Sequence, residues 1–161
     1  MDEVEIIKNI IVSNLFMTLA TSAKNIPWSC PLFFASDKDL NIYFTSYNDA
    51  LHVKQVAENP NVAVSIFDSH AVPGTGNTQA VYISGKCKRV LGTELSYAIE
   101  VVYSKRFPDP KERERRDLSV EHFSLPDSVG RIDHIYKIEA KKFYILDKKM
   151  GKDTRIEVQI K

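Results

Sequence analysis

A histidine and a lysine, His52 and Lys54, stand two residues apart near the start of a predicted short helix. Asn48 and Asp49 precede them and are residue types that cap helix N-termini, while Asn59-Pro60 predicts the end of the helix. Free backbone N–H groups and the helix dipole attract anions to such an N-terminus, so the spacing suggests a phosphate site. The alternative is a solvated histidine and lysine on an exposed helix face. Both interpretations stay open at this point.

Two predicted strands flank this helix and would hold it in place. Residues 42–45 are β-branched and aromatic, which is typical of a half-buried strand. Val62 to Phe67 is a nearly continuous apolar run, which predicts a strand covered on both faces. Within the helix, Ala50, Val53 and Ala57 share one face, with Val56 beside them, and we expect this face to be buried.

The rest of the chain contains further strands joined by short turns. Asp2 and Glu5 have the spacing of a capping box, so we expect a covering helix over residues 3–13. Gly85 inside a long strand predicts a bulge or a bend that lets the sheet curl. The other predicted elements are strands over 15–21, 28–35, 79–91, 132–146 and 155–161, a helix ending at Phe107-Pro108, and a charged surface excursion over 108–130. The first three strands are joined by turns too short for a parallel crossover. The pattern therefore predicts a mainly β fold, an antiparallel Greek-key-like barrel with flanking helices.

Length and composition limit the classes of protein to consider. The 161 residues fit a single domain over 1–161, and 43% of them are hydrophobic, enough for a core. Twenty-two basic residues nearly balance 21 acidic ones, which gives no general argument for binding nucleic acid. The N-terminus has no basic region before an apolar stretch, and no apolar run is long enough to span a membrane. We therefore expect a cytoplasmic protein that binds neither membranes nor nucleic acid.

The cysteines and histidines do not have the spacing of a metal site. Cys30 and Cys87 are the two cysteines, with no C-x-x-C motif, which suits a reducing compartment. His70, His122 and His134 show no metal-ligand spacing, so we expect no bound metal.

Several motifs occur in an order that resembles a known superfamily. They are LATS, PWSCPLFF, LNIYFTSYNDALHVKQVAENPNVAVSIFD, QAVYISGKCKRV and YSKRF, which together span roughly residues 10–107. This order is similar to the pyridoxamine 5′-phosphate oxidase-like superfamily of FMN-binding split β-barrels, and the C-terminal third resembles its small uncharacterised bacterial branch. The resemblance implies a homodimer that binds FMN at the interface between its subunits.

The positions that match the family's FMN site depart from its pattern in two places. Cys30 stands where the family has an arginine for the FMN phosphate, and His52 stands where it has a lysine. Thr45 and Ser46 match the segment that holds the flavin and its phosphate, and Gln79 or Ala80 falls near a flavin-contacting glutamine. The resemblance implies a cofactor site that includes Ser29, Cys30, Pro31, Phe44, Thr45, Ser46, His52, Val53, Lys54, Gln79 and Lys149.

The end of the chain departs from the family's substrate motif. True pyridoxamine phosphate oxidases carry W-x-x-x-R-L-x-P there, whereas KKMGKDTRIEVQIK contains no Trp, His or Pro. The resemblance therefore implies a flavin reductase or another flavin-dependent oxidoreductase that acts on an unknown small substrate, and not a vitamin B6 oxidase. Two alternatives remain open: a flavin or haem binding module without turnover, and an F420-dependent reductase.

Overall fold

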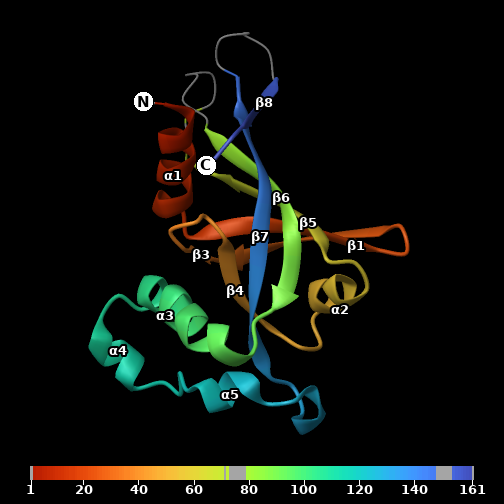
Figure 1. The fold of residues 1–161 in the computed structure, drawn as a ribbon, viewed down its shortest axis with the longest axis vertical. Helices are drawn as coiled ribbons and strands as arrows, with labels where there is room; N and C mark the ends of the chain where they lie inside the picture. The colour runs from red at the N-terminus through yellow and green to blue at the C-terminus, as the bar shows by residue number, and fades with distance from the viewer. Residues whose placement is uncertain (1, 71, 73–78, 148–153, 161) are drawn as a thin grey trace.

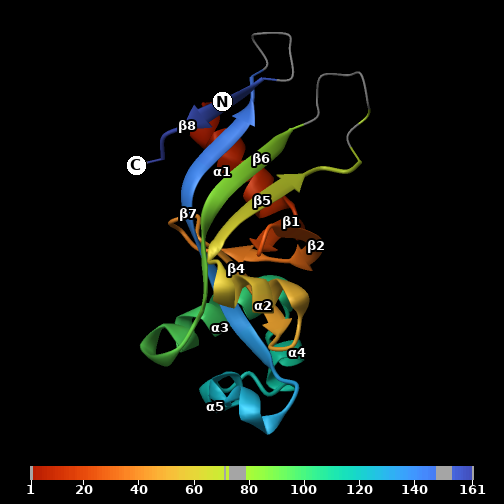
Figure 2. The same ribbon diagram turned by 90° about the vertical axis from the view of Figure 1, so that its right-hand side faces the viewer.

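A computed structural model describes residues 2–70, 72, 79–147 and 154–160 of the chain. Its centre is an eight-stranded antiparallel sheet in the order β2-β1-β5-β6-β7-β4-β3, with β8 paired to β7. The sheet curls strongly, so that β5, β6 and β7 curve side by side above the β1–β2 hairpin (Figures 1 and 2). The strands are β1 (Phe16–Ala23), β2 (Ile26–Phe33), β3 (Ala35–Ser36), β4 (Ile42–Tyr47), β5 (Asn61–Phe67), β6 (Ala80–Arg89), β7 (Asp133–Leu146) and β8 (Arg155–Val158). The predicted antiparallel barrel with flanking helices is confirmed.

Helices flank the sheet, and the shortest of them lie at one end of the molecule (Figure 1). The helices are α1 (Glu3–Ser13), α2 (Leu51–Glu58), α3 (Leu95–Arg106), α4 (Pro110–Glu114) and α5 (Val120–Ser124), with 3₁₀ turns at Gly92–Glu94 and Asp127–Val129. The capping box predicted at Asp2 and Glu5 is present at the start of α1. In the ranges that the structure describes, no helix is long and apolar enough to cross a membrane.

Two apolar clusters hold the elements together. The larger one fills the inside of the curled sheet under α1 and includes Ile11, Leu19, Phe44 and Ile66, all fully buried. The smaller one lies on the outside, between α3 and the β4–β7 pair, and includes Tyr43, Leu95 and Ile135. The outside of β4 and β7 is thus covered by α3, whereas no helix of the described residues lies on the outer face of β1, β2 and β5.

Within a single chain, the prediction that β5 is covered on both faces is wrong. Its residues alternate between buried and accessible, with Val62, Val64 and Ile66 inside. Ala63 is exposed on the other face, and the side chain of Phe67 is 48% exposed. Alanine and phenylalanine on the outer side made the run look nearly continuous in the sequence, with Ser65 as its single polar residue, although only one face is covered within the chain.

The bulge predicted at Gly85 is confirmed, with the extra residue on the partner strand β7. The register of β6 against β7 shifts between Ser84 and Gly85, where β7 has an extra residue. A Cβ atom at Gly85 would lie 2.5 Å from the carbonyl oxygen of Glu139, so no side chain fits without a shift of the backbone. The bulge increases the local twist and helps the sheet to curl.

The segment over 108–130 carries more structure than the charged surface excursion expected. It contains α4, α5 and a 3₁₀ turn, and it lies below α3 at one end of the molecule (Figure 1). The side chain of Phe123 is buried against α3, where its ring lies 5.7 Å from that of Tyr103. The segment therefore covers one end of the smaller apolar cluster.

Candidate functional site

The start of α2 differs from the prediction. Ala50 occupies the N-cap position, and no side chain caps the helix. The Asn48 side chain instead donates to the carbonyl oxygen of Gly130 and accepts from the backbone N–H of Ile132. The Asp49 carboxylate accepts a hydrogen bond from Arg131 at 3.1 Å. Both residues thus fasten the β4–α2 corner to the start of β7 and do not cap α2.

The buried face of α2 also differs from the prediction. His52, Gln55 and Val56 face the sheet, whereas Ala57 is exposed. The amide of Gln55 bonds Thr21 on β1 and the carbonyl oxygen of Ile26 on β2. These bonds fix the rotation of the helix against the β1–β2 hairpin and turn His52 inwards.

His52 is held in a small buried polar cluster. Its Nε2 atom lies 2.7 Å from the hydroxyl of Ser46, and its Nδ1 atom lies 3.5 Å from the thiol of Cys30. Only 8% of the residue is exposed. The interpretation of His52 as a solvated residue on an exposed face is therefore wrong, and both ring nitrogens already have partners inside the protein.

The groups of this cluster are neutral at physiological pH. Burial lowers the pKa of His52, and burial raises the pKa of the Cys30 thiol against a smaller opposing effect of a hydrogen bond with Trp28. A neutral imidazole and a thiol give a phosphate dianion none of the charge that it normally requires. The cluster can position α2 against β2 and β4, but it cannot replace the arginine and lysine of the family pattern.

The pleat of the strands divides the predicted cofactor residues between two faces of the sheet. Cys30 contacts the inner core and His52, while Ser29 and Pro31 alternate with it and lie outside. On β4, Phe44 is fully buried inside and stacks on Tyr136 with ring centroids 5.4 Å apart. Its neighbour Thr45 therefore points to the outer side, towards α3. The structure thus does not bring these predicted residues together in one site.

The outer face of the sheet holds a shallow cavity. Its volume is about 370 Å³, and its walls are small or hydroxylated side chains together with two tyrosines. The lining residues are Thr18, Ala20, Ser29, Ala63, Val64, Ser65, Tyr82, Ile83, Ser84 and Tyr144. Phe16 lies on the same face at 62% exposure and contacts Phe33 edge to face. A flat apolar group can approach this surface closely because most of its side chains are short.

Arg106 is a candidate binding residue that the sequence analysis did not select. It is the last residue of α3, and its Nη1 atom donates to the hydroxyl of Thr45 at 3.2 Å. Its guanidinium also lies 5.7 Å from the ring centre of Phe33, on the outer face of β2. The motif YSKRF had drawn attention to this corner, but helical spacing alone gave no sign that Arg106 reaches β4.

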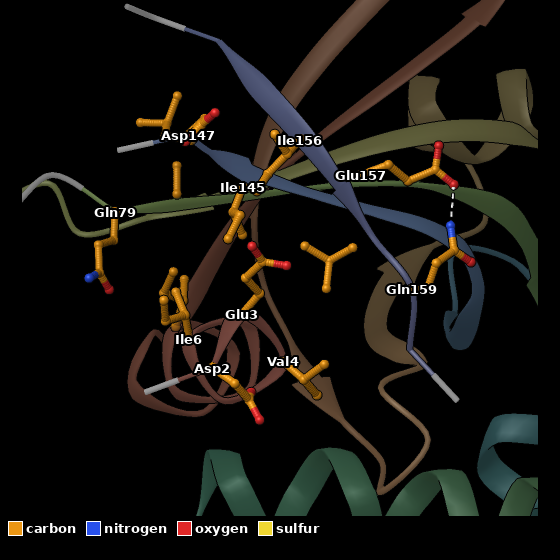
Figure 3. A pocket seen from close by; sticks show the side chains of 14 residues that line it. Asp2, Glu3, Val4, Ile6, Gln79, Ile145, Asp147, Ile156, Glu157 and Gln159 are labelled. Carbon is orange, nitrogen blue, oxygen red and sulfur yellow. Dashed lines mark hydrogen bonds between the residues drawn. The ribbon is translucent and has the colours of Figure 1, made fainter. Parts of the chain in front are cut away.

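Gln79 lies far from the other predicted residues. It points into a larger cavity of about 940 Å³ between α1 and the ends of β6, β7 and β8 (Figure 3). Isoleucine and valine side chains line this cavity together with the carboxylates of Asp2, Glu3, Asp147 and Glu157. This acidic lining does not suit a phosphate group.

The other predicted residues contribute in different ways. Val53 is half buried and packs against the inner core, while Lys54 is exposed on α2. Lys149 lies outside the described residues. Among the residues that are described, no three His, Cys, Asp or Glu side chains come close enough to hold a metal ion together.

The sequence and the fold both find relatives among known proteins. Residues 4–124 match the family model for pyridoxamine 5′-phosphate oxidase. The chain belongs to this family. The split-barrel superfamily inferred from the motifs is thereby confirmed. No curated protein matches the chain.

Solved structures of several bacterial proteins have the same fold. A haem binding protein from Mycobacterium smegmatis has a TM-score of 0.71 and 16% identity, covering 98% of this chain. This chain spans 58% of that protein's length. A conserved hypothetical protein from Mycobacterium tuberculosis has a TM-score of 0.70 and 17% identity, covering 96% of this chain and 90% of its own. An FAD-binding protein from Mesorhizobium loti has a TM-score of 0.63 and 15% identity, covering 99% and 96%. At these identities the similarity establishes the fold alone.

Proposed function

We propose that the protein is an FMN-binding flavoprotein, an oxidoreductase of the flavin reductase type that acts on a small substrate. The observation that carries this proposal is the uncovered outer face of β1, β2, β5 and β6, with its shallow cavity of about 370 Å³. Membership of the pyridoxamine 5′-phosphate oxidase family supports it, as does the name of the FAD-binding relative.

The residues of the outer face suit the ring system of a flavin. Ala20, Ala63 and Ser65 have short side chains, so a flat ring could lie close to the strands. Tyr82 and Tyr144 are cross-strand partners at the side of the cavity and offer aromatic surface for stacking. Bound FMN would supply the hydride or electron transfer, and the residues of the chain would bind it, orient it and exclude water.

A second copy of the chain would complete this site, and we propose that the protein is a homodimer with the cofactor at the subunit interface. The side chains of Phe16 and Phe67 are 62% and 48% exposed on the outer face. Large apolar side chains exposed on one face are typical of an interaction surface. A two-fold axis would place the same face of the partner over both residues. The shallow cavity would then be enclosed on both sides.

Haem is the alternative ligand, since one structural relative is named as a haem binding protein. No histidine occurs among the described residues that line the outer cavity. His52, His122 and His134 each have their Nε2 atom engaged by a serine or an aspartate, and the Nδ1 atom of His134, which has no hydrogen-bond partner, belongs to a fully buried side chain. FMN therefore fits the described residues better. F420 is a further alternative because its deazaflavin ring is equally flat.

The absorbance spectrum of the freshly purified protein tests this proposal. We expect the two visible bands of an oxidised flavin, and release of FMN on denaturation, identified by its mass. An Ala63→Arg variant, which blocks the outer face, should be purified with less flavin. A Soret band would favour haem, and F420 fluorescence would favour the deazaflavin. A colourless protein that takes up no added FMN would contradict the proposal.

A further inference from the structure

We propose that Arg106, together with Thr45, binds the 5′-phosphate of FMN, an inference that rests on the proposed function. The phosphate site would then lie outside the sheet, at the junction of α3 and β4. It would not lie at Cys30 and His52, the two positions of the family pattern, because both face the inner core and are neutral.

Arg106 is fixed in position by three contacts. Its Nη1 atom donates to the Thr45 hydroxyl at 3.2 Å. Its guanidinium carbon lies 5.7 Å from the ring centre of Phe33 and 5.7 Å from that of Phe107. These contacts orient the planar group without consuming its charge, and a guanidinium held in this way loses little entropy when it binds an anion.

Arg106 also lacks a carboxylate partner in the described part of the chain. Other arginines in that part form ion pairs: Arg89 with Asp127, Arg115 and Arg116 with Glu112, and Arg131 with Asp49. One N–H of Arg106 is engaged by Thr45, so further donors of its five remain for a phosphate oxygen. An arginine fork matches phosphate geometry in a bidentate manner.

The charges around Arg106 favour an anion. Arg116 places its guanidinium 3.8 Å from the ring centre of Phe107, so two guanidinium groups flank the same ring. The carboxylate of Glu112 is shared between Arg116 and Arg115, and that of Asp133 is engaged by His122. The neighbouring Lys105 turns away and donates to the carbonyl oxygen of Asn14 at 2.7 Å.

The position of Arg106 is continuous with the cavity proposed for the flavin ring. Phe33, which the guanidinium contacts, alternates with Pro31 and Ser29 on the outer face of β2. Ser29 lines the outer cavity. A ligand that lies along this face can therefore present its ring to the cavity and its phosphate to Arg106.

The test compares FMN with riboflavin, which has the same ring and lacks the phosphate. Affinities for both would be measured by quenching of flavin fluorescence in the wild type, Arg106→Ala and Arg106→Lys. We expect Arg106→Ala to weaken FMN binding by roughly tenfold or more, the effect of losing a charge-assisted hydrogen bond, and to change riboflavin binding less than about twofold. Arg106→Lys keeps the positive charge and loses the forked guanidinium. Its affinity for FMN should lie between those of the wild type and Arg106→Ala. Lys38→Ala is the control, because it removes an exposed basic side chain that has none of these contacts, and it should leave both affinities unchanged.

The outcomes separate this inference from the function on which it rests. If the wild type binds no FMN, both the proposed function and the phosphate site are wrong. If FMN binds and Arg106→Ala leaves its affinity unchanged, the phosphate site alone is wrong. Equal weakening of FMN and riboflavin would also overturn it, because Arg106 would then act on the fold or the ring and not on the phosphate. Melting temperatures of all variants would show whether each one is folded.

Discussion

At the scale of single residues, the chemistry of His52 is set by burial. Both ring nitrogens have partners, Ser46 and Cys30, and the ring packs near Phe44 at 6.3 Å between centroids. A proton added to this ring would place a positive charge in a site with no carboxylate bonded to it. His52 is therefore a structural link between α2, β2 and β4, and it makes the stability of the fold depend on pH.

We predict that the protein loses stability as the pH falls from 7 to 5, and that the His52→Gln variant loses less stability over the same range. Burial lowers the pKa of His52 in the folded state below its ordinary value near 6.5. The unfolded chain therefore takes up a proton at a higher pH than the folded protein, and unfolding is favoured as the pH drops through this range. Thermal denaturation of both proteins at pH 7 and pH 5 measures the effect. Equal losses in the two proteins would contradict this role of His52.

Some site residues could be predicted from the sequence, and others could not. The pattern identified the strand–helix–strand unit and placed His52 in the first turn of α2. It did not show which way the helix is rotated, because that depends on the bonds of Gln55 to Thr21 and Ile26, which lie 34 and 29 residues away in the chain. The contact of Arg106 with Thr45 joins residues 61 positions apart in the chain, so it could not be predicted from the sequence for the same reason.

At the scale of elements, the positions of strands were predicted better than their ends and their exposure. The β1–β2 turn lies at Lys24 and Asn25, both with positive φ, so β2 begins at Ile26, two residues before the expected start at Trp28. Gly85 correctly indicated the bulge. The exposure of β5 could not be predicted, because apolar residues on an exposed face give the same sequence pattern as apolar residues on a buried face.

We predict that Gly85→Ala destabilises the protein by about 1–3 kcal/mol, the usual cost of overpacking. The added methyl group would meet the carbonyl oxygen of Glu139 at 2.5 Å and the side chain of Ile138 at 2.9 Å. Denaturant unfolding measures the loss. Ser84→Ala, one residue earlier and on the accessible face, is the control and should change stability by less than about 0.5 kcal/mol. An unchanged midpoint for Gly85→Ala would show that the bulge can relax.

At the scale of the whole molecule, the proposed site depends on what covers the outer face of the sheet. Inside the barrel, the apolar core is continuous and α1 closes it. Outside, α3 packs against β3, β4 and β7, and the apolar side chains of β1, β2 and β5 remain accessible. Pairing of two such faces would bury these side chains and enclose the shallow cavity. The proposed dimer interface and the proposed FMN site therefore lie on the same face of the sheet.

We predict that Ala20→Arg converts the proposed dimer to a monomer. Ala20 lies at the centre of the outer face, opposite Ser29 on β2 and Ala63 on β5. An unpaired charge buried in an interface costs several kcal/mol, enough to prevent association at micromolar concentration. Size-exclusion chromatography with light scattering should give the mass of one 18.3 kDa chain for the variant and twice that mass for the wild type. Val12→Arg, on the exposed side of α1, is the control and should remain dimeric. If the Ala20→Arg variant stays dimeric, the interface does not lie on the outer face of the sheet.

Native mass spectrometry of the purified protein tests the central claim, an FMN site completed by two copies of the chain, most directly. We expect a species of two chains carrying two FMN molecules, and we expect the flavin to be lost when the dimer is dissociated. A single chain that retains FMN would contradict the shared site. A dimer that neither contains FMN nor takes it up would contradict the proposed function itself.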